Sequence, residues 1–307
     1  MPWRPAGPSR KTRPVEGDTV LEHAADLIIL RPEPVPVPWS ELGEGPVWDV
    51  AAGALYWVDI PAGRVHRLAD GGYASWDVGA DAGAVVPRAG GGVVVAAGTG
   101  FVALDPATGE VTPLAGTSSP PDTRMNDGAC DRAGRFYAGT MGYDEAPGRG
   151  TFYRLDPDHS VTEIYPGVGV SNGVGWSPDD RLMYYIDSLE HRVDVMDYDP
   201  ATGGIGERRP FVRLGSGEVV PDGLAVDADG GVWVAVWGGG VIQRYDARGT
   251  LIGVVRLPAA YVTSCAFGGR DLDQLYITTA AGPGRDAGAL FTCPAGVAGL
   301  AAHPFRG

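Results

Sequence analysis

The feature of this sequence that most restricts its fold is a short phrase that recurs six times. Each copy has a turn rich in Gly or Asp, followed by an apolar or aromatic strand. The copies run over residues 53–59, 91–96, 134–139, 181–187, 230–235 and 273–278. Equivalent positions, from Tyr56 to Tyr276, lie 38 to 49 residues apart. Such periods built from strands are typical of propeller blades. The repeat therefore predicts an all-β, six-bladed β-propeller with four-stranded blades.

The segments that follow the phrases support this prediction. Most copies are followed by a second strand and a turn, and residues 105–109 and 199–203 both read Asp-Pro-x-x-Gly. In such turns proline fixes φ and glycine takes a positive φ. No helical periodicity longer than a turn or two interrupts the pattern. A β-sandwich or two small barrels are the alternatives, and the regular period favours the propeller.

The two ends of the chain are expected to differ. A propeller needs a strand from the N-terminal side to complete its last blade, and residues 25–30, Ala-Asp-Leu-Ile-Ile-Leu, could supply it. Residues 1–20 are then a flexible extension outside the fold. The propeller domain is expected to cover residues 21–307.

Charge and cysteine content exclude several classes of function. The net charge is −14 and the isoelectric point is near 4.7, so nucleic acid and anionic membrane surfaces would be repelled. Three widely spaced cysteines indicate neither a disulfide framework nor a CxxC metal site. No apolar run approaches 18 residues. A cytoplasmic protein that is a monomer or a weak homo-oligomer is the expectation.

Polar residues interrupt the apolar pattern in four segments, each a short distance before a blade phrase. The segments are residues 42–48, 124–128, 170–176 and 220–226. Taken singly, the Asn-Gly and Asp-Gly pairs within them are ordinary turn signals. In register across four blades, they predict a site on the propeller axis. Oxygen donors without His or Cys suit a hard cation such as Ca²⁺, Mg²⁺ or Mn²⁺.

Over about residues 38–280 the sequence resembles the senescence-marker-protein, gluconolactonase and regucalcin family of six-bladed, metal-dependent lactonases. The motifs that carry the resemblance are spread over the whole region. They are Gly-Glu-Gly-Pro-Val-Trp at 43–48, Val-Asp-Ile-Pro at 58–61, Arg-Met-Asn-Asp-Gly at 124–128, Gly-Arg-Phe-Tyr-Ala-Gly-Thr-Met at 134–141, Ser-Asn-Gly at 171–173, Tyr-Tyr-Ile-Asp-Ser at 184–188 and Pro-Asp-Gly at 221–223.

The resemblance implies a set of metal ligands. The glutamate of the first motif, the asparagine of Ser-Asn-Gly and the aspartate of Pro-Asp-Gly bind the metal in the family. These residues correspond to Glu44, Asn172 and Asp222. One divalent cation is implied, with Ca²⁺ as the first choice and Mg²⁺, Mn²⁺, Zn²⁺ or Fe²⁺ as alternatives.

The resemblance also implies contacts to a small sugar lactone. The arginine and asparagine of the third motif correspond to Arg124 and Asn126, and in related propellers that asparagine reaches the metal. Asp144 stands where the family often has a glutamate that contacts substrate. The shorter side chain of aspartate changes the reach toward the sugar and leaves the identity of the lactone open.

The expected chemistry is hydrolysis of an aldonolactone, such as glucono-, xylono- or arabinono-lactone, to the aldonic acid. A divalent cation polarises the carbonyl and lowers the pKa of water. Asp222 or Asp127 would orient or deprotonate the attacking water, with Asp222 slightly favoured. One alternative is a calcium-binding regulatory propeller without turnover. Another is an esterase or phosphotriesterase of the same fold, which a hydrophobic lid would indicate.

Two further groups of residues receive structural interpretations. Asp59 and Asp187 close blade phrases and are expected to accept backbone hydrogen bonds between blades. Three histidines fall on predicted outer strands or turns and are expected to lie on the surface: His66, His159 and His191.

Overall fold

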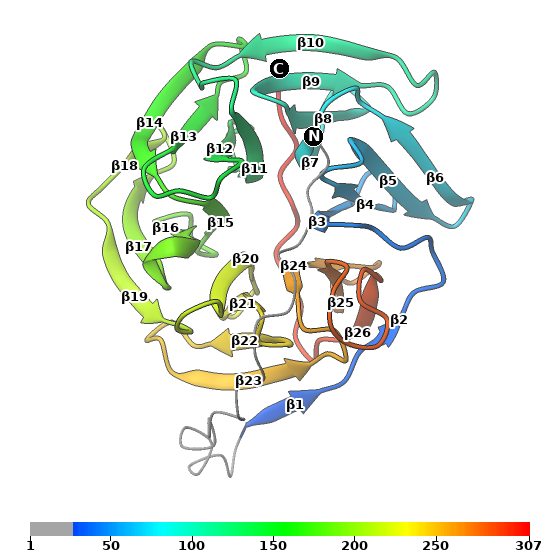
Figure 1. The fold of residues 1–307 in the computed structure, drawn as a ribbon, viewed down its shortest axis with the longest axis vertical. Helices are drawn as coiled ribbons and strands as arrows, with labels where there is room; N and C mark the ends of the chain where they lie inside the picture. The colour runs from blue at the N-terminus through cyan, green and yellow to red at the C-terminus, as the bar shows by residue number, and fades with distance from the viewer. Residues whose placement is uncertain (1–26) are drawn as a thin grey trace.

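The computed structural model describes residues 27–307, which form six small sheets arranged around a central axis (Figure 1). The predicted six-bladed β-propeller is therefore confirmed. The predicted extension of residues 1–20, together with residues 21–26, lies outside the described residues.

Each blade begins with its innermost strand and proceeds outward through antiparallel neighbours. Blade 1 consists of β3 (Gly43–Asp49), β4 (Ala54–Asp59), β5 (Arg64–Ala69) and β6 (Gly72–Asp77). Blade 2 consists of β7 (Ala82–Pro87), β8 (Val93–Ala97), β9 (Gly100–Leu104) and β10 (Val111–Gly116). Blade 3 consists of β11 (Thr123–Cys130), β12 (Phe136–Gly142), β13 (Gly150–Leu155) and β14 (Val161–Val168).

The other three blades follow the same plan, two of them with small additions. Blade 4 consists of β15 (Ser171–Trp176), β16 (Leu182–Asp187), β17 (Arg192–Asp199) and β19 (Arg209–Arg213), with β18 (Gly204–Ile205) beside β17 and the 3₁₀ turn η2 (Ser188–Glu190). Blade 5 consists of β20 (Val220–Val226), β21 (Val232–Trp237), β22 (Val241–Tyr245) and β23 (Leu251–Arg256), with β1 (Ile28–Leu30) outside β23. Blade 6 consists of β24 (Val262–Gly268), β25 (Gln274–Thr279), β26 (Phe291–Pro294) and β2 (Glu33–Pro34).

The recurring phrases form the second strand of each blade, and the four polar segments form innermost strands. The turns also follow the sequence, since Gly109 has a φ of 76° and donates its N–H to the carbonyl of Asp105 over 2.8 Å. Because the innermost strands line the axis, the fold brings the four polar segments together.

The strand that closes the ring is not the one expected from the sequence. Ile28–Leu30 pairs in parallel with β23 and extends blade 5, so the assignment of residues 25–30 to ring closure was wrong. Closure is made by Glu33–Pro34, which pairs with β26 of blade 6. This strand is short because Pro34 has no N–H to donate to the ladder.

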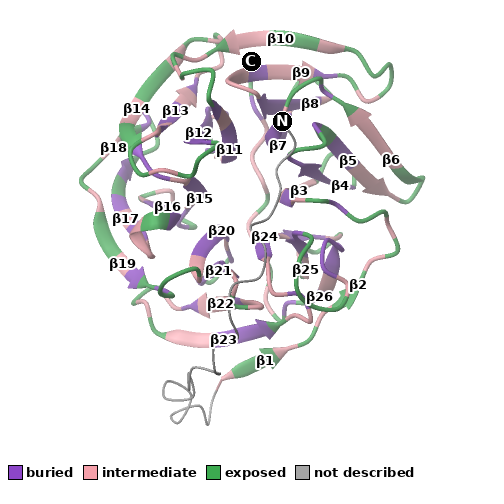
Figure 2. Ribbon diagram, viewed as in Figure 1, coloured by how far each residue is buried: buried purple, intermediate pink, exposed green. Residues whose placement is uncertain are grey.

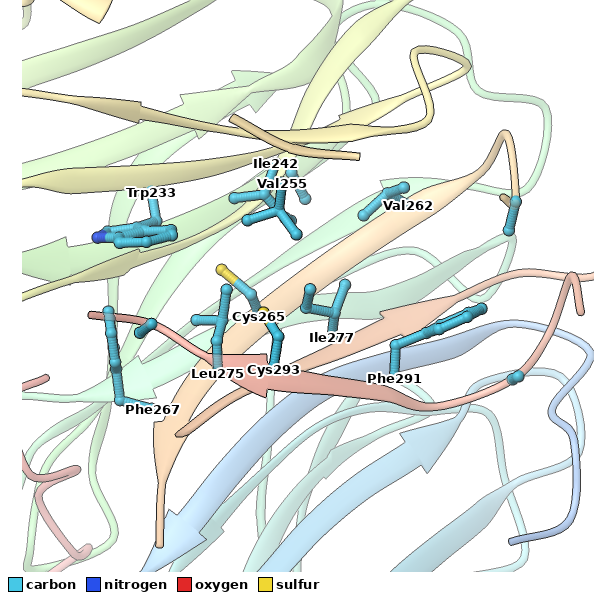
Figure 3. Close-up of a cluster of buried hydrophobic side chains, with 14 of the residues drawn as sticks. Trp233, Ile242, Val255, Val262, Cys265, Phe267, Leu275, Ile277, Phe291 and Cys293 are labelled. Carbon is cyan, nitrogen blue, oxygen red and sulfur yellow. The ribbon is translucent and has the colours of Figure 1, made fainter. Parts of the chain in front are cut away.

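The hydrophobic core is divided into six clusters, each between two adjacent blades. Figure 2 shows burial concentrated in the strands nearest the axis, while the outer strands are partly exposed. Figure 3 shows the cluster between blades 5 and 6, where Trp233 faces Phe267 with ring centroids 5.6 Å apart. Every blade is therefore stabilised mainly by apolar contact with its two neighbours.

Residues 295–307, here called the C-terminal strap, cross the face of the propeller after β26 (red in Figure 1). On one side, the amide of Ala228 in blade 5 donates to the carbonyl of Ala298 over 2.9 Å. On the other side, Phe305 donates its N–H to Pro87 of blade 2 over 2.8 Å. The Phe305 side chain is fully buried in the cluster between blades 2 and 3. The strap thus links opposite sides of the ring.

One predicted surface histidine is buried, and this corrects the sequence interpretation. His66 on β5 is 3% exposed, stacks on Trp57 with centroids 5.0 Å apart, and its Nδ1 hydrogen-bonds the Tyr73 hydroxyl over 2.7 Å. Burial lowers its pKa to about 4. The imidazole is therefore a flat, neutral component of an aromatic stack. His159 and His191 are half-buried in turns.

The three cysteines are free and buried. Across residues 27–307, no helix has the length and apolar character needed to cross a membrane.

Candidate metal centre

All six innermost strands carry a bulge, and each bulge begins within the first three residues of its strand. The register shifts lie at Glu44/Val47, Ala82/Ala84, Met125/Gly128, Asn172/Val174, Pro221/Leu224 and Val262/Ser264. A bulge places two residues of one strand opposite one residue of its partner and redirects side chains. The polar residues predicted from the sequence lie at or beside these bulges. The repeated bulge therefore builds one ring of side chains around the axis.

The Asn-Gly and Asp-Gly pairs of the site are strand residues and not turns. Gly173 and Gly223 lie within β15 and β20 and do not have a positive φ. A Cβ on Gly223 would come within 2.1 Å of the Ser264 hydroxyl, and one on Gly173 within 2.9 Å of the Asp222 carbonyl. Glycine is needed here because neighbouring innermost strands approach closely.

Glu44 and Asp222 are two buried carboxylates on different blades. They are 4% and 5% exposed. Glu44 accepts a hydrogen bond from the Gly45 amide over 3.0 Å. Burial raises the pKa of Glu44 to about 8, and repulsion from Asp127 adds to the rise. Burial, followed by repulsion from Glu44 and Asp127, raises the pKa of Asp222 well above its ordinary value. Both groups therefore lack enough positive charge among their protein neighbours.

Two asparagines, one from blade 3 and one from blade 4, hydrogen-bond one another. The amide nitrogen of Asn126 donates to Oδ1 of Asn172 over 3.1 Å and to the Ser171 carbonyl over 2.8 Å. Asn172 donates in turn to the hydroxyl of Ser188 over 2.9 Å, and that hydroxyl donates to the carbonyl of Pro221 over 2.7 Å. These bonds fix the orientation of Oδ1 on each amide.

The residues present fit a hard divalent cation. Oδ1 of Asp222 is buried and has no hydrogen-bond partner, which is costly unless another group binds it. The neighbouring donors are carboxylate and amide oxygens of Glu44, Asn172 and Asn126, the ligands preferred by Ca²⁺, Mg²⁺ and Mn²⁺. Within residues 27–307, no three His, Cys, Asp or Glu side chains gather closely enough to hold an ion by themselves. The amide oxygens of the two asparagines are available to add to the carboxylates in such a ligand set.

Asp127 lies at the boundary between the polar centre and an apolar cavity. Its Oδ1 accepts from the Gly128 amide over 2.7 Å, and burial raises its pKa to about 6. It lines a cavity of about 300 Å³ that extends along the channel, past Trp176 and Phe267, to the C-terminal strap at residues 300–303. Asp127 is thus a buried carboxylate close to the centre and open to space on its other side.

Arg124 is the cation nearest to this acidic centre. Its Nη1 donates to Oδ1 of Asn126 over 2.6 Å and to the Met125 carbonyl over 3.0 Å. Its Nε and Nη2 groups make no hydrogen bond within residues 27–307. Burial lowers its pKa, opposed first by the charge of Asp81 and then by that of Glu44. Arg124 therefore keeps N–H groups for a ligand beside the carboxylates.

Asp144, the remaining predicted substrate residue, lies in an exposed turn after β12. Its Oδ1 accepts from the Ala146 amide over 3.2 Å. Its role as a substrate contact stays a prediction. The structure adds Asp81 and Tyr143 at this end of the site, two residues that sequence reasoning missed. Tyr143 hydrogen-bonds Asp81 across blades, so no local pattern joins them.

The acidic residues at the ends of the second strands bind backbone, as expected. Asp187 accepts from the amides of Gly169 and Val170 over 2.9 and 3.1 Å. Those residues belong to the connection that leads from blade 3 to β15. Asp59 holds the connection into β3 in the same way. Both aspartates therefore stabilise the entry of an innermost strand that carries a residue of the candidate site.

Comparison with known proteins identifies the family of this chain. Residues 42–281 match the family model described as the SMP-30/Gluconolactonase/LRE-like region. Regucalcin of Danio rerio is 42% identical over 241 residues, covering 77% of this chain and 82% of the relative.

Two solved structures share the fold over nearly their whole length. The structure of a calcium-binding protein, regucalcin, from Agrobacterium tumefaciens superposes with a TM-score of 0.84 at 27% identity, covering 91% of this chain and 99% of that chain. The structure of a luciferin-regenerating enzyme gives a TM-score of 0.83 at 31% identity, covering 90% and 99%. This chain therefore belongs to the SMP-30/gluconolactonase/LRE-like family.

Proposed function

We propose that this protein hydrolyses sugar lactones, opening an aldonolactone such as glucono-, xylono- or arabinono-lactone to its acid. A divalent cation held by Glu44, Asn172 and Asp222 would assist the reaction, with Ca²⁺ as the expected ion. Family membership and the calcium-binding regucalcin of Agrobacterium tumefaciens support the proposal.

Two features of the site, close to one another, support the proposal: carboxylates that need a cation, and N–H donors that are free to bind a substrate. The unpartnered Oδ1 of Asp222 and the raised pKa of Glu44 call for a cation. Directly beside them, Arg124 keeps N–H groups that can bind an oxygen-rich ligand. Ester hydrolysis needs both features, since the carbonyl must be polarised and the developing oxyanion stabilised.

The bound cation would supply Lewis acidity, which polarises the lactone carbonyl and lowers the pKa of water. Glu44 and Asp222 would hold that cation with their carboxylates, and Asn172 with the amide oxygen that Asn126 now bonds. Burial of these side chains keeps bulk water away and strengthens their electrostatic interactions. The hydrogen bond from Asn172 to Ser188 would keep the amide oxygen facing inward.

Asp127 is our choice for the group that orients or deprotonates the attacking water, with Asp222 as the alternative. Asp222 is already needed for the cation, whereas Asp127 is not among the proposed ligands and lines the channel cavity. In this mechanism Asp127 takes a proton from water as the water oxygen attacks the carbonyl carbon. The proton then passes to the ring oxygen when the carbon–oxygen bond breaks, which yields the hydroxy acid.

Arg124 and Asn126 would position the substrate. A guanidinium has no acceptor and cannot bind a cation, so the unused Nε and Nη2 groups of Arg124 suit substrate oxygens. Asn126 hydrogen-bonds both Arg124 and Asn172. It therefore links the residue proposed to bind substrate with a residue proposed to bind the cation. Asp144 is retained as a further proposed contact at the exposed rim.

The test is proton release from a panel of aldonolactones, measured with the purified protein before and after chelation and after the return of single divalent cations. Chelator-sensitive hydrolysis that one cation restores is the expected result. Turnover that survives complete removal of metal, verified by elemental analysis, would refute the metal-dependent mechanism. Absence of turnover with every cation would refute the lactonase assignment.

A calcium-binding role without turnover is the second candidate, favoured by the likeness to the regucalcin structure described as calcium-binding. Arg124 distinguishes the two functions. A site that served only to bind calcium would have no substrate for the unused N–H groups of Arg124 to bind. In that case calcium would bind, the wild type would consume no lactone, and replacing Arg124 would alter neither result.

A further inference from the structure

An exposed tyrosine stands over the Arg124 side of the centre. Tyr143 follows β12 of blade 3 directly, and 58% of its surface is exposed. Its hydroxyl donates to Oδ2 of Asp81 over 2.7 Å. Asp81 lies immediately before β7, so the bond connects blade 3 with blade 2. The amide of Gly98 donates to the Asp81 carbonyl over 2.8 Å, and the Gly98 carbonyl accepts from the amide of Met125, the neighbour of Arg124, over 2.7 Å. These bonds hold Asp81, and with it Tyr143, close to Arg124.

The backbone of Tyr143 is held from two sides. Its own amide donates to the carbonyl of Asp122 over 3.2 Å. The amide of Glu145 donates to the carbonyl of Gly142 over 3.0 Å, so Tyr143 occupies the second position of a tight turn. With its hydroxyl bound to Asp81 as well, the ring has a fixed position. An exposed aromatic ring that is already ordered loses little entropy when a ligand packs on it.

Blade 2 contributes Asp81, which precedes its innermost strand β7, and no polar side chain from β7 itself. The residues of β7 at the level of the centre are Ala82, Gly83 and Ala84, which have no polar side chain. A Cβ on Gly83 would come within 2.5 Å of the Asn126 carbonyl oxygen, so no larger residue fits there. Oδ1 of Asp81 makes no hydrogen bond within residues 27–307 and is left as an acceptor.

These groups have the complementary chemistry of a polyhydroxylated ring. Arg124 offers N–H donors, Asp81 offers an acceptor oxygen, and Tyr143 offers an aromatic face. A sugar ring has apolar C–H faces and an edge of hydroxyls that both donate and accept hydrogen bonds. Small-ligand sites commonly combine an apolar wall with a few directional polar groups. An apolar lactone would offer no partner to Oδ1 of Asp81 or to the Nε and Nη2 groups of Arg124.

We infer that Asp81 and Tyr143 form the subsite that selects hydroxylated rings, with Tyr143 packing on one face of the ring and Asp81 accepting from its hydroxyls. This inference rests on the proposed function and names residues that select its substrate. The Tyr143 hydroxyl fixes the carboxylate of Asp81, so the two residues act as a unit. Neither residue is required to hold the cation.

The experiment compares an aldonolactone with δ-valerolactone, which has the six-membered lactone ring but no hydroxyls. We expect Asp81→Ala to lower the ratio of the two kcat/KM values about ten- to a hundredfold, as expected for a lost charged hydrogen bond. Tyr143→Phe keeps the ring but releases Asp81, and a decrease of about three- to tenfold is expected. Tyr73→Phe, a change of the same kind on the outer strand β6, is the matched control.

A second measurement separates this inference from the proposed function. 1,5-Anhydroglucitol has the hydroxylated ring but no ester, and its binding to wild type and Asp81→Ala can be followed calorimetrically. Lactone hydrolysis with an unchanged kcat/KM ratio in Asp81→Ala would overturn the subsite and leave the lactonase standing. Binding of 1,5-anhydroglucitol that Asp81→Ala abolishes, without hydrolysis of any lactone, would support the subsite and refute the lactonase. Neither binding nor hydrolysis would overturn both.

Discussion

The two halves of each innermost strand differ in character. On β15, Asn172 belongs to the polar centre, whereas Val174 and Trp176 pack between blades 3 and 4. On β20, Asp222 has an unpartnered carboxylate oxygen, whereas Leu224, two residues later, packs between blades 4 and 5. The bulge lies between the two halves in each strand.

The difference teaches that one strand can serve chemistry at one end and stability at the other. The polar half holds carboxylates whose pKa values burial raises, which is an unfavourable arrangement for folding. The apolar half and the C-terminal strap offset this cost through close packing. Changes in the polar half should therefore remove activity without unfolding the protein. Changes in the apolar half should lower the stability of the fold while the folded protein stays active.

The largest effect is expected at the metal centre. Glu44→Gln, Asn172→Ala and Asp222→Asn should each lower lactone hydrolysis about a thousandfold or more, because each removes a proposed ligand. Elemental analysis after dialysis should show loss of bound cation, and circular dichroism should show an intact fold. Near-normal turnover with metal bound in any one of the three variants would contradict its assignment as a ligand.

The stability of the Glu44→Gln variant provides a second test of the difference between the two halves. The folded-state pKa of Glu44 is raised, so the metal-free protein loses stability as the pH rises from the ordinary carboxyl pKa toward 8. Glu44→Gln removes that charge. In the presence of chelator at pH 8, its melting temperature should therefore equal or exceed that of wild type. A large decrease would mean that the carboxylate stabilises the fold.

The second-largest effect is expected in the C-terminal strap. Phe305→Ala should reduce the free energy of unfolding by about 3 to 5 kcal/mol, since it empties a fully buried site between blades 2 and 3. Urea denaturation measures this change, and Arg306→Ala, at the exposed neighbour, is the control. Activity of the folded Phe305→Ala protein should stay within about twofold of wild type. Lost activity without lost stability would contradict the division between the two halves.

A smaller effect on activity is expected for Arg124. Arg124→Ala should lower kcat/KM about ten- to a hundredfold, or roughly 1 to 3 kcal/mol, as for the loss of charged hydrogen bonds. The affinity for the cation should be retained, which isothermal titration can check, and Arg248→Ala in an exposed turn is the control. An unfolded Arg124→Ala protein would show that the arginine is a structural partner of the surrounding carboxylates.

The smallest effect concerns His66 and the pH dependence of stability. Because its folded pKa is lowered to about 4, the unfolded chain binds the extra proton first, and stability falls as the pH decreases from about 6.5 to 4. His66→Phe should remove about 1 to 3 kcal/mol of that decrease, while the other titrating groups contribute equally to both proteins. Identical pH profiles of the unfolding free energy for wild type and His66→Phe would contradict this.

The blade architecture could be predicted from the sequence because each blade repeats the same local pattern. The ring-closing strand could not, because Ile28–Leu30 has the apolar character of a strand while Glu33–Pro34 lies in a proline-rich segment. The outer edge of β23 accepted the apolar segment instead. Burial of His66 depends on a tertiary stack with Trp57 that no alternation of residues indicates.

The residues of the centre could be predicted because they fall in register on innermost strands, as Glu44 and Asn172 do. Asp81 and Tyr143 were missed for the opposite reason. They lie in a loop and at a strand end of different blades, and only the closed ring brings them together. Local spacing therefore identifies residues that share a position in the repeat, but not contacts between different positions.

The pairing of Glu33–Pro34 with β26 has a consequence for biosynthesis. The first strand of the ring leaves the ribosome long before its partner, since Glu33 pairs with Thr292. Its ladder can form only after Thr292 has been made, and closing so long a loop is entropically costly and slow. Blades 1 to 5 can assemble during translation, in the order in which they emerge. Ring closure therefore waits until Thr292 has left the ribosome, and docking of Phe305 follows it.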